Sequence, residues 1–321
     1  MVPAKLKQGD LIRIIAPAHS FSPDFTDVKR NKGIERLGQL GLKVSFGKYV
    51  DVFDEFKTTT VDNRLEDLHD AFSDPDVKAI IPVSGGSSAN QLLKYIDYDL
   101  IRTNPKILCG LSDITDLANA IHAKTGLMVY YGPSFRMLSS GKLIGYMLKN
   151  LHDTFFEDAP VDIVPPDFYS DDENDNRSIA NEGFWPINSG KVEGRSIGGN
   201  LLTFGLSLGN EFIASIKDKI LFLEENDIID YRGVQKQLQA ILNHQGGDKI
   251  KGLIIGRFQH GTGMTRELLT HIVKSKRELD NIPVVGNVDV SHTLPVYTFP
   301  IGGLISMDVK NDETKISLLE H

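Results

Sequence analysis

The chain has 321 residues, of which 40 % are hydrophobic and 24 % are charged, and its formal net charge at pH 7 is -8. These values are typical of a globular protein of about two domains. The acidic balance argues against nucleic acid or an anionic membrane surface as the main partner, because both require basic surface patches.

The first half of the chain alternates short apolar runs with longer amphipathic ones. The pattern predicts strands over 11–18, 42–47, 77–86, 105–111 and 127–133, and helices over 27–40, 60–74, 89–96 and 113–126. Repeated strand–helix units predict a mostly parallel sheet with helices on both faces. Ligands bind such sheets at the carboxyl ends of the strands, which here means the turns after Val83 and Leu111.

Residues 165–186 are acidic and poor in aliphatic side chains, which favours an inter-domain linker or an active-site loop. The second half predicts strands over 219–226, 249–258 and 282–292, helices over 231–246 and 265–278, and two strands within 300–321. It looks smaller and richer in β-structure. We therefore expect an α/β protein with an N-terminal domain over 1–164, an inter-domain loop over 165–186 and a β-rich C-terminal domain over 187–321.

The single cysteine and the lack of long apolar runs indicate which cellular compartment the sequence favours. Cys109 is the single cysteine, so an intramolecular disulfide is excluded, which fits a reducing compartment. No apolar run reaches the length of a membrane span, and the first 20 residues lack a secretory cleavage pattern. We expect a cytoplasmic protein with no membrane partner.

The segment CGLSDIT (109–115) places a serine at a predicted strand-to-helix corner. The hydroxyl of Ser112 would be exposed above the sheet, and backbone N–H groups at the helix start could stabilise an oxyanion. The second glycine of the G-x-S-x-G elbow is missing, so a plain helix N-cap is the alternative for this serine.

Two glycines follow the predicted strand over 77–86, in VSGGSSAN (83–90). Gly85 and Gly86 would let the backbone approach a ligand and point N–H groups at negative charge. An oxyanion hole, a phosphate cradle and an ordinary tight turn all fit this pattern. Neither the dinucleotide fingerprint nor a P-loop is present, which argues against a nucleotide-cofactor oxidoreductase.

Two further strand ends carry candidate groups. FLEEN (222–226) places Glu224 and Glu225 after an apolar run, and DVSHTLP (289–295) places His292 after another. A histidine beside a carboxylate could form the base and orienting acid of a catalytic triad. Solvated acids and a loop histidine are the alternatives. Scattered histidines and one cysteine argue against a metal site.

Five stretches in order, over nearly the whole chain, resemble the LD-carboxypeptidase family of serine peptidases: 81–99, 109–115, 194–201, 221–226 and 290–303. Within the family, the chain is more similar to the microcin-immunity branch than to the murein tetrapeptide branch. The resemblance implies a Rossmann-like N-terminal domain, a smaller β-rich C-terminal domain, a site in the cleft between them, a homodimer and no cofactor.

The resemblance also implies roles for individual residues. Ser112 would be the nucleophile, His292 the general base, and Glu224 the acid that orients the imidazole. The backbone N–H groups of Gly86 and Asp113 would form the oxyanion hole.

Substrate contacts are implied for Gly85, Ser87 and Asn200. Trp185, at the end of the acidic segment, would stack on the nucleobase of an aminoacyl-adenylate-like substrate, and packing between domains is its alternative role.

The reaction implied is hydrolysis of an amide through an acyl-enzyme, acting on a small molecule or a peptide. Two substrates fit: an aminoacyl-nucleotide and a murein tetrapeptide. The chain departs from the family pattern at Ser84, where the murein branch often has arginine, and at Ser291, where glycine is frequent. A non-catalytic protein that holds a small ligand in the same cleft is the alternative from another class.

Overall fold

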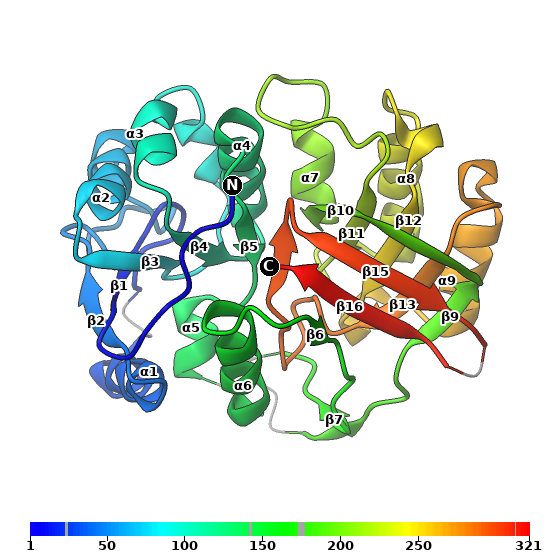
Figure 1. Cartoon of the computed structure of the whole chain (residues 1–321), viewed down its shortest axis with the longest axis horizontal. Helices are drawn as coiled ribbons and strands as arrows, with labels where there is room; N and C mark the ends of the chain where they lie inside the picture. The colour runs from blue at the N-terminus through cyan, green and yellow to red at the C-terminus, as the bar shows by residue number, and fades with distance from the viewer. Residues whose placement is uncertain (23–24, 141–142, 173–176, 312) are drawn as a thin grey trace.

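Two large β-sheets lie side by side in the computed structural model, with the first formed mainly by the N-terminal half (Figure 1). The structure describes residues 1–321 apart from 23–24, 141–142, 173–176 and 312. The first sheet has the order β14-β5-β4-β3-β1-β2, formed by β1 (Leu11–Ile15), β2 (Lys43–Phe46), β3 (Val77–Pro82), β4 (Ile107–Gly110), β5 (Val129–Tyr131) and β14 (Phe299–Ile301). β1 to β5 are parallel, and β14 is antiparallel to β5. The predicted mostly parallel N-terminal sheet is confirmed.

Helices cover both faces of this sheet. They are α1 (Asp27–Gln39), α2 (Val61–Ser73), the 3₁₀ helix η1 (Ala89–Leu92), α3 (Tyr98–Thr103), α4 (Ile114–Thr125), α5 (Phe135–Ser139) and α6 (Ile144–Phe155). Leu37 of α1 and Phe135 of α5 belong to one buried cluster, and Leu68 of α2 and Leu117 of α4 belong to another. Burial on both faces explains why these strands read as continuous apolar runs.

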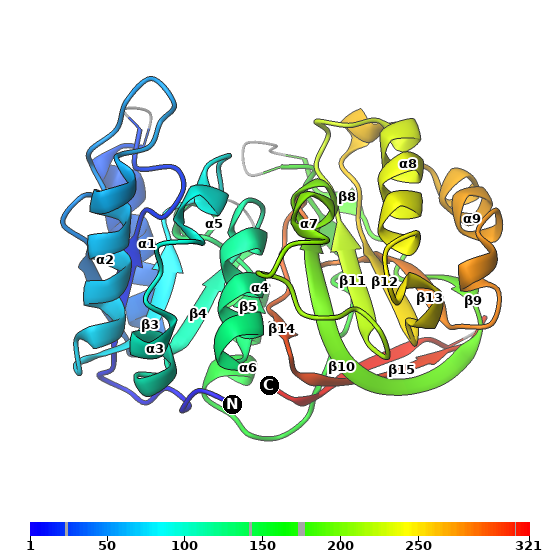
Figure 2. The same ribbon diagram turned by 90° about the horizontal axis from the view of Figure 1, so that it is seen from above.

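The second sheet is mixed and has eight strands in the order β6-β16-β15-β10-β11-β12-β13-β9. They are β6 (Val161–Asp162), β9 (Trp185–Asn188), β10 (Gly190–Asn200), β11 (Ile220–Glu224), β12 (Gly252–Gly256), β13 (Val284–Val288), β15 (Leu304–Val309) and β16 (Lys315–Glu320). β10 to β13 are parallel and the remaining pairs are antiparallel. β10 is long and curved (Figure 2). The β-rich C-terminal domain is confirmed.

One side of the second sheet is covered by helices that were only partly predicted. They are α7 (Leu201–Ser207), α8 (Tyr231–Leu242) and α9 (Arg266–Lys274), with the 3₁₀ helices η2 (Gly247–Lys249), η3 (His260–Thr262) and η4 (Arg277–Leu279). Leu201, Leu238 and Leu269, one from each α-helix, share a buried cluster with Leu223 of β11. Within the described residues, no helix is long and apolar enough to cross a lipid bilayer.

Several elements differ from the sequence expectation. The helix predicted over 89–96 is only the short η1, which ends at Leu92. The helices α3, α5, α6 and α7 were not predicted. α7 begins after the glycine-rich β10 because the Asn200 side chain accepts a hydrogen bond from Thr203 N–H and caps the helix.

Strand pairing crosses the expected domain boundaries. β14 lies in the C-terminal part of the chain but extends the first sheet, and β6 lies before residue 165 but pairs with β16. The segment expected to be a loop contains a small hairpin of β7 (Phe168–Tyr169) and β8 (Ile179–Ala180), and β9 starts at its end. Residues 173–176 of that segment lie outside the described residues.

The two halves meet where α4 begins and β10 ends. Asn119 of α4 donates to the Gly198 carbonyl at 2.9 Å, and the Asn200 N–H donates to Thr115 Oγ1 at 2.9 Å. Gly199 has φ +140°, and a Cβ there would lie 2.5 Å from Thr115 Oγ1. This close approach brings the carboxyl ends of β10 and β11 to the turn after β4.

Candidate active site

Ser112 occupies a strained turn between the buried strand β4 and helix α4. Its φ is +63°, a left-handed conformation that costs a non-glycine residue about 1 kcal/mol or more. The N-cap of α4 is Asp113, and its side chain makes no capping hydrogen bond. Helix capping therefore does not account for Ser112. Its backbone N–H donates to the hydroxyl of Tyr131 at 2.9 Å.

The glycine turn after β3 lies directly against Ser112. A Cβ on Gly85 would fall 2.6 Å from Ser112 Cβ and 3.0 Å from its Oγ, so only glycine fits there. A Cβ on Gly86 would fall 2.8 Å from Cδ2 of His19. The two glycines therefore let this turn lie against Ser112 and His19, and their approach to a ligand stays a prediction.

Asp113 and Arg64 fix this turn relative to Ser112. The Asp113 carboxylate accepts from the N–H groups of Ser88 and Ala89, and the buried Arg64 guanidinium donates to the Ser88 carbonyl at 2.9 Å. Within the described residues, the backbone N–H groups of Gly86 and Asp113 have no intramolecular acceptor. Both are free to donate to a ligand.

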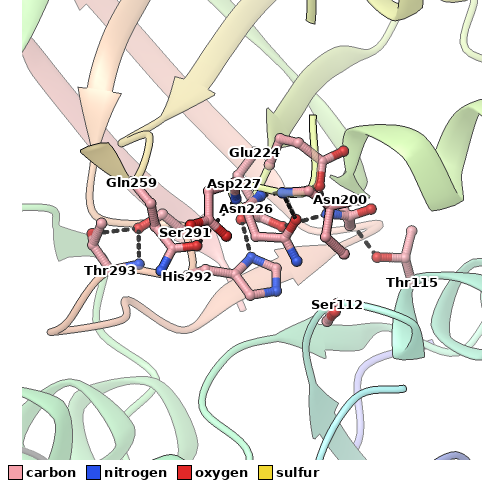
Figure 3. A network of polar contacts seen from close by, with 12 residues as sticks. Ser112, Thr115, Asn200, Glu224, Asn226, Asp227, Gln259, Ser291, His292 and Thr293 are labelled. Carbon is pink, nitrogen blue, oxygen red and sulfur yellow. Dashed lines mark hydrogen bonds and ion pairs between the residues drawn. The ribbon is translucent and has the colours of Figure 1, made fainter. Parts of the chain in front are cut away.

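Glu224 and His292 meet at the ends of two strands of the second sheet. Nδ1 of His292 lies 2.6 Å from Oε2 of Glu224, whose side chain is fully buried. Burial disfavours the charged imidazolium, but the attraction of the Glu224 carboxylate and its hydrogen bond outweigh this effect and raise the pKa of His292. Figure 3 shows the imidazole between Glu224 and Ser112. The remaining ring nitrogen, Nε2, is therefore available on the side of the serine.

The second acid, Glu225, has a different environment from Glu224. Its carboxylate accepts from Asn200 Nδ2 at 2.8 Å, from Leu202 N–H at 2.9 Å and from Asn226 N–H at 3.0 Å. Burial, together with the neighbouring Glu224 carboxylate, raises its pKa. Glu225 therefore holds the local backbone and Asn200, and it has no hydrogen bond to His292.

Ser112 and His292 line one pocket of about 280 Å³, which draws residues from both halves of the chain. Its lining is His19, Ser84, Gly85, Gly86, Leu111, Ser112, Ser134, Arg136, Met137, Asp172, Asn226, Gln259 and His292. Burial and the nearby Lys57 cation lower the pKa of His19. A larger hollow of about 890 Å³ is lined by Ser215, His244, Asp248 and Glu278, but no hydrogen bond joins any two of these four side chains, all of which the structure describes. The smaller pocket is the candidate site, because its His292 is bonded to the buried Glu224.

Three predicted substrate contacts lie outside this pocket. Ser87 is exposed beside it, and Asn200 is buried with its amide bonded to both Glu224 and Glu225. Trp185 is half-buried, donates from Nε1 to Glu182 at 3.2 Å and lines a separate hollow of about 460 Å³. Gly85 lines the pocket, and its contact with a substrate stays a prediction.

Sequence reasoning missed several pocket residues and one buried link. His19, Ser134 and Arg136 follow β1 and β5, and a signal existed because ligands gather at such strand ends. Tyr131 donates from its hydroxyl to Oε1 of Glu224 at 2.6 Å. It resembles any buried strand residue in the sequence, so no local signal marks it.

Comparison with known proteins places this geometry in a family. Sequence models of the LD-carboxypeptidase N-terminal and C-terminal domains match residues 12–132 and 193–307. The Bacillus subtilis protein named "Putative carboxypeptidase YocD" is 36 % identical, with 100 % of each chain covered. The crystal structure of an MccF-like protein from Bacillus anthracis str. Ames has a TM-score of 0.97 and 39 % identity, and 100 % of each chain is covered.

A third relative has been solved with a ligand. The microcin C7 self-immunity protein MccF of Escherichia coli is 30 % identical, over 99 % of this chain and 96 % of the relative. Its structure in complex with aspartyl sulfamoyl adenosine has a TM-score of 0.88 at 29 % identity, covering 100 % of this chain and 99 % of that one. The protein described here belongs to the LD-carboxypeptidase family of serine peptidases.

Proposed function

We propose that the pocket hydrolyses an amide bond by a Ser112–His292–Glu224 triad, through an acyl-enzyme. The observation that carries this proposal is the short His292–Glu224 hydrogen bond at the edge of a pocket that Ser112 also lines. With Nδ1 bound to the buried carboxylate, Nε2 accepts the Ser112 proton during attack on the substrate carbonyl and later donates it to the leaving amine. Water, deprotonated by the same nitrogen, then releases the acyl group.

The free N–H groups of Gly86 and Asp113 support an oxyanion hole. Both border the Ser112 turn, and both are fixed by the bonds from Asp113 and Arg64 to the 88–89 backbone. Donors fixed before the reaction stabilise the charge that develops on the tetrahedral intermediate, and removing one such donor typically slows catalysis by about 10²–10³-fold.

For the substrate, we propose an aminoacyl-nucleotide whose amide joins an amino acid to a nucleotide-like group. The similarity over the full length to MccF, solved with aspartyl sulfamoyl adenosine, supports this class. Gln259 lines the nucleophile pocket, and its chain neighbours Phe258 and His260 line the hollow that contains Trp185. The indole face suits a nucleobase there. A homodimer and a cytoplasmic location remain expectations.

The test is mass-spectrometric turnover of aspartyl sulfamoyl adenosine and of a murein tetrapeptide. Wild type, Ser112→Ala and the matched control Ser73→Ala are compared, since Ser73 is an exposed serine at the end of α2 and does not line the pocket. We expect wild type and Ser73→Ala to cleave the nucleotide analogue and Ser112→Ala to be inactive. Cleavage of the tetrapeptide alone would reassign the substrate to the murein class. Binding without cleavage of either compound would favour a ligand-binding protein.

A further inference from the structure

Tyr131 is the last residue of β5 and reaches across to the second sheet. Its side chain is fully buried, and its ring lies 5.7 Å, centroid to centroid, from that of Phe222 on β11. An apolar ring would fill this space equally well. Burying a hydroxyl is unfavourable unless it is hydrogen-bonded, so the reason for tyrosine must lie in the bonds that the hydroxyl makes.

The hydroxyl bridges the nucleophile turn and the acid of the triad. It accepts the Ser112 N–H at 2.9 Å and donates to Oε1 of Glu224 at 2.6 Å. The directions are fixed, because a backbone amide can only donate and an ionised carboxylate can only accept. Burial, followed by the Glu224 charge, raises the pKa of Tyr131 well above its ordinary value, so the proton stays on the hydroxyl.

Two consequences follow for the site. The Ser112 N–H is occupied, so it supports the left-handed turn that presents the nucleophile and leaves oxyanion binding to Gly86 and Asp113. The charge of Glu224 is shared: Oε1 accepts from Tyr131 and, at 3.2 Å, from Asn200, while Oε2 faces His292. Donors on Oε1 stabilise the carboxylate and weaken its attraction for the imidazolium proton.

We propose that Tyr131 is a positioning residue that couples the Ser112 turn to the Glu224–His292 pair. It holds the serine backbone in its left-handed conformation, and it limits how far Glu224 raises the basicity of His292. The proposal rests on the proposed triad for its effect on turnover. Its effect on the imidazole is measurable without any substrate.

The test variant is Tyr131→Phe, which keeps the buried ring and removes one oxygen. Tyr130→Phe is the matched control, because Tyr130 is also buried but packs in the cluster on the opposite face of the sheet, with its ring 5.0 Å from Phe155. The pKa of His292 is measured by NMR titration of protein with isotope-labelled histidine. We expect it to rise in Tyr131→Phe and to stay at the wild-type value in Tyr130→Phe.

The second measurement is turnover by the same variants. Loss of a hydrogen bond to a charged group and of the support for Ser112 predicts a fall in kcat of about ten- to hundredfold in Tyr131→Phe, with KM little changed. A residue that only filled space would leave both the imidazole titration and kcat at wild-type values. That result would overturn the proposal. Full turnover by Ser112→Ala would instead refute the triad. In that case the NMR titration of His292 in Tyr131→Phe would still test whether Tyr131 is coupled to His292.

A second replacement keeps the proposal testable if Tyr131→Phe does not fold. Incorporating 3-fluorotyrosine at position 131 leaves the ring in place and makes the hydroxyl a stronger donor. Glu224 would then hold less negative charge for His292, so the titration should shift downward, opposite to the shift in Tyr131→Phe. An unchanged titration in the fluorinated protein would contradict the coupling.

Discussion

Replacing Glu224 by glutamine tests the orienting acid with the smallest change in shape. Glu224 is about 1 % exposed, and its Oε2 lies 2.6 Å from Nδ1 of His292. Glutamine keeps the volume but removes the charge and offers an N–H where the imidazole also presents one. The ring is then driven to the tautomer that carries its proton on Nε2, where it cannot accept the Ser112 proton. In a serine protease triad, the corresponding acid-to-amide change lowers kcat about 10⁴-fold, and we expect a loss of that order in Glu224→Gln.

The matched control for this experiment is Glu225→Gln. Glu225 is buried to the same extent one residue further on, but it is bonded to Asn200 and to backbone N–H groups and has no hydrogen bond to His292. Steady-state kcat and an NMR titration of His292 are measured for both variants. The pKa of His292 should fall strongly in Glu224→Gln, because the carboxylate is what raises it, and only slightly in Glu225→Gln. Equal losses of kcat with equal titration shifts would refute the assignment of Glu224 as the orienting acid.

Four further predictions follow from the site. Gly85→Ala should lower kcat by about 10²-fold or more, because the new Cβ would lie 2.6 Å from Ser112 Cβ and displace the nucleophile. In the control Gly145→Ala the new Cβ meets no atom within 4 Å, so kcat should match wild type. Circular dichroism checks that both variants fold. The acidic limb of the pH profile of kcat/KM for hydrolysis should lie above the ordinary histidine value of about 6.5, because the base must be neutral and its pKa is raised. Because the pKa of His292 is raised by folding, its protonation also stabilises the folded protein. This contribution to the free energy of unfolding is full below the unfolded pKa and is lost as the pH rises through the folded pKa. Denaturant titrations of wild type and His292→Gln at several pH values measure it. Trp185→Phe should raise KM for aspartyl sulfamoyl adenosine and leave KM for a ligand without a nucleobase unchanged.

The strands and helices that could be predicted from the sequence are those that local residue patterns determine. Apolar runs buried on both faces marked β1, β3 and β4, and amphipathic spacing marked α1, α2 and α8. The short helices α5 and α7 were missed because their boundaries depend on side-chain caps, from Ser134 and Asn200, rather than on a long periodic pattern. The placement of β14 in the first sheet depends on pairing with β5, about which the local sequence says nothing.

The site was predictable in its residue types and only partly in its contacts. Parallel strands bring their carboxyl ends to one edge, which is why Ser112, Glu224 and His292 could each be proposed. Ser87, Asn200 and Trp185 lie outside the pocket that Ser112 lines, because tertiary packing sets their burial and partners. Their contacts with a substrate stay predictions. The Tyr131–Glu224 hydrogen bond joins residues that are 93 positions apart, in two different sheets, and could be found only from coordinates.

The covalent intermediate on Ser112 is the most direct test of the central claim. Wild type would be mixed with aspartyl sulfamoyl adenosine, quenched in acid within milliseconds, and analysed by intact-mass and peptide mass spectrometry, with Ser112→Ala treated in parallel. We predict a transient aminoacyl adduct on the peptide that contains Ser112, absent from the variant and formed as the nucleotide-like group is released. Turnover by wild type without such an adduct, or the same turnover and adduct in Ser112→Ala, would contradict a serine acyl-enzyme mechanism.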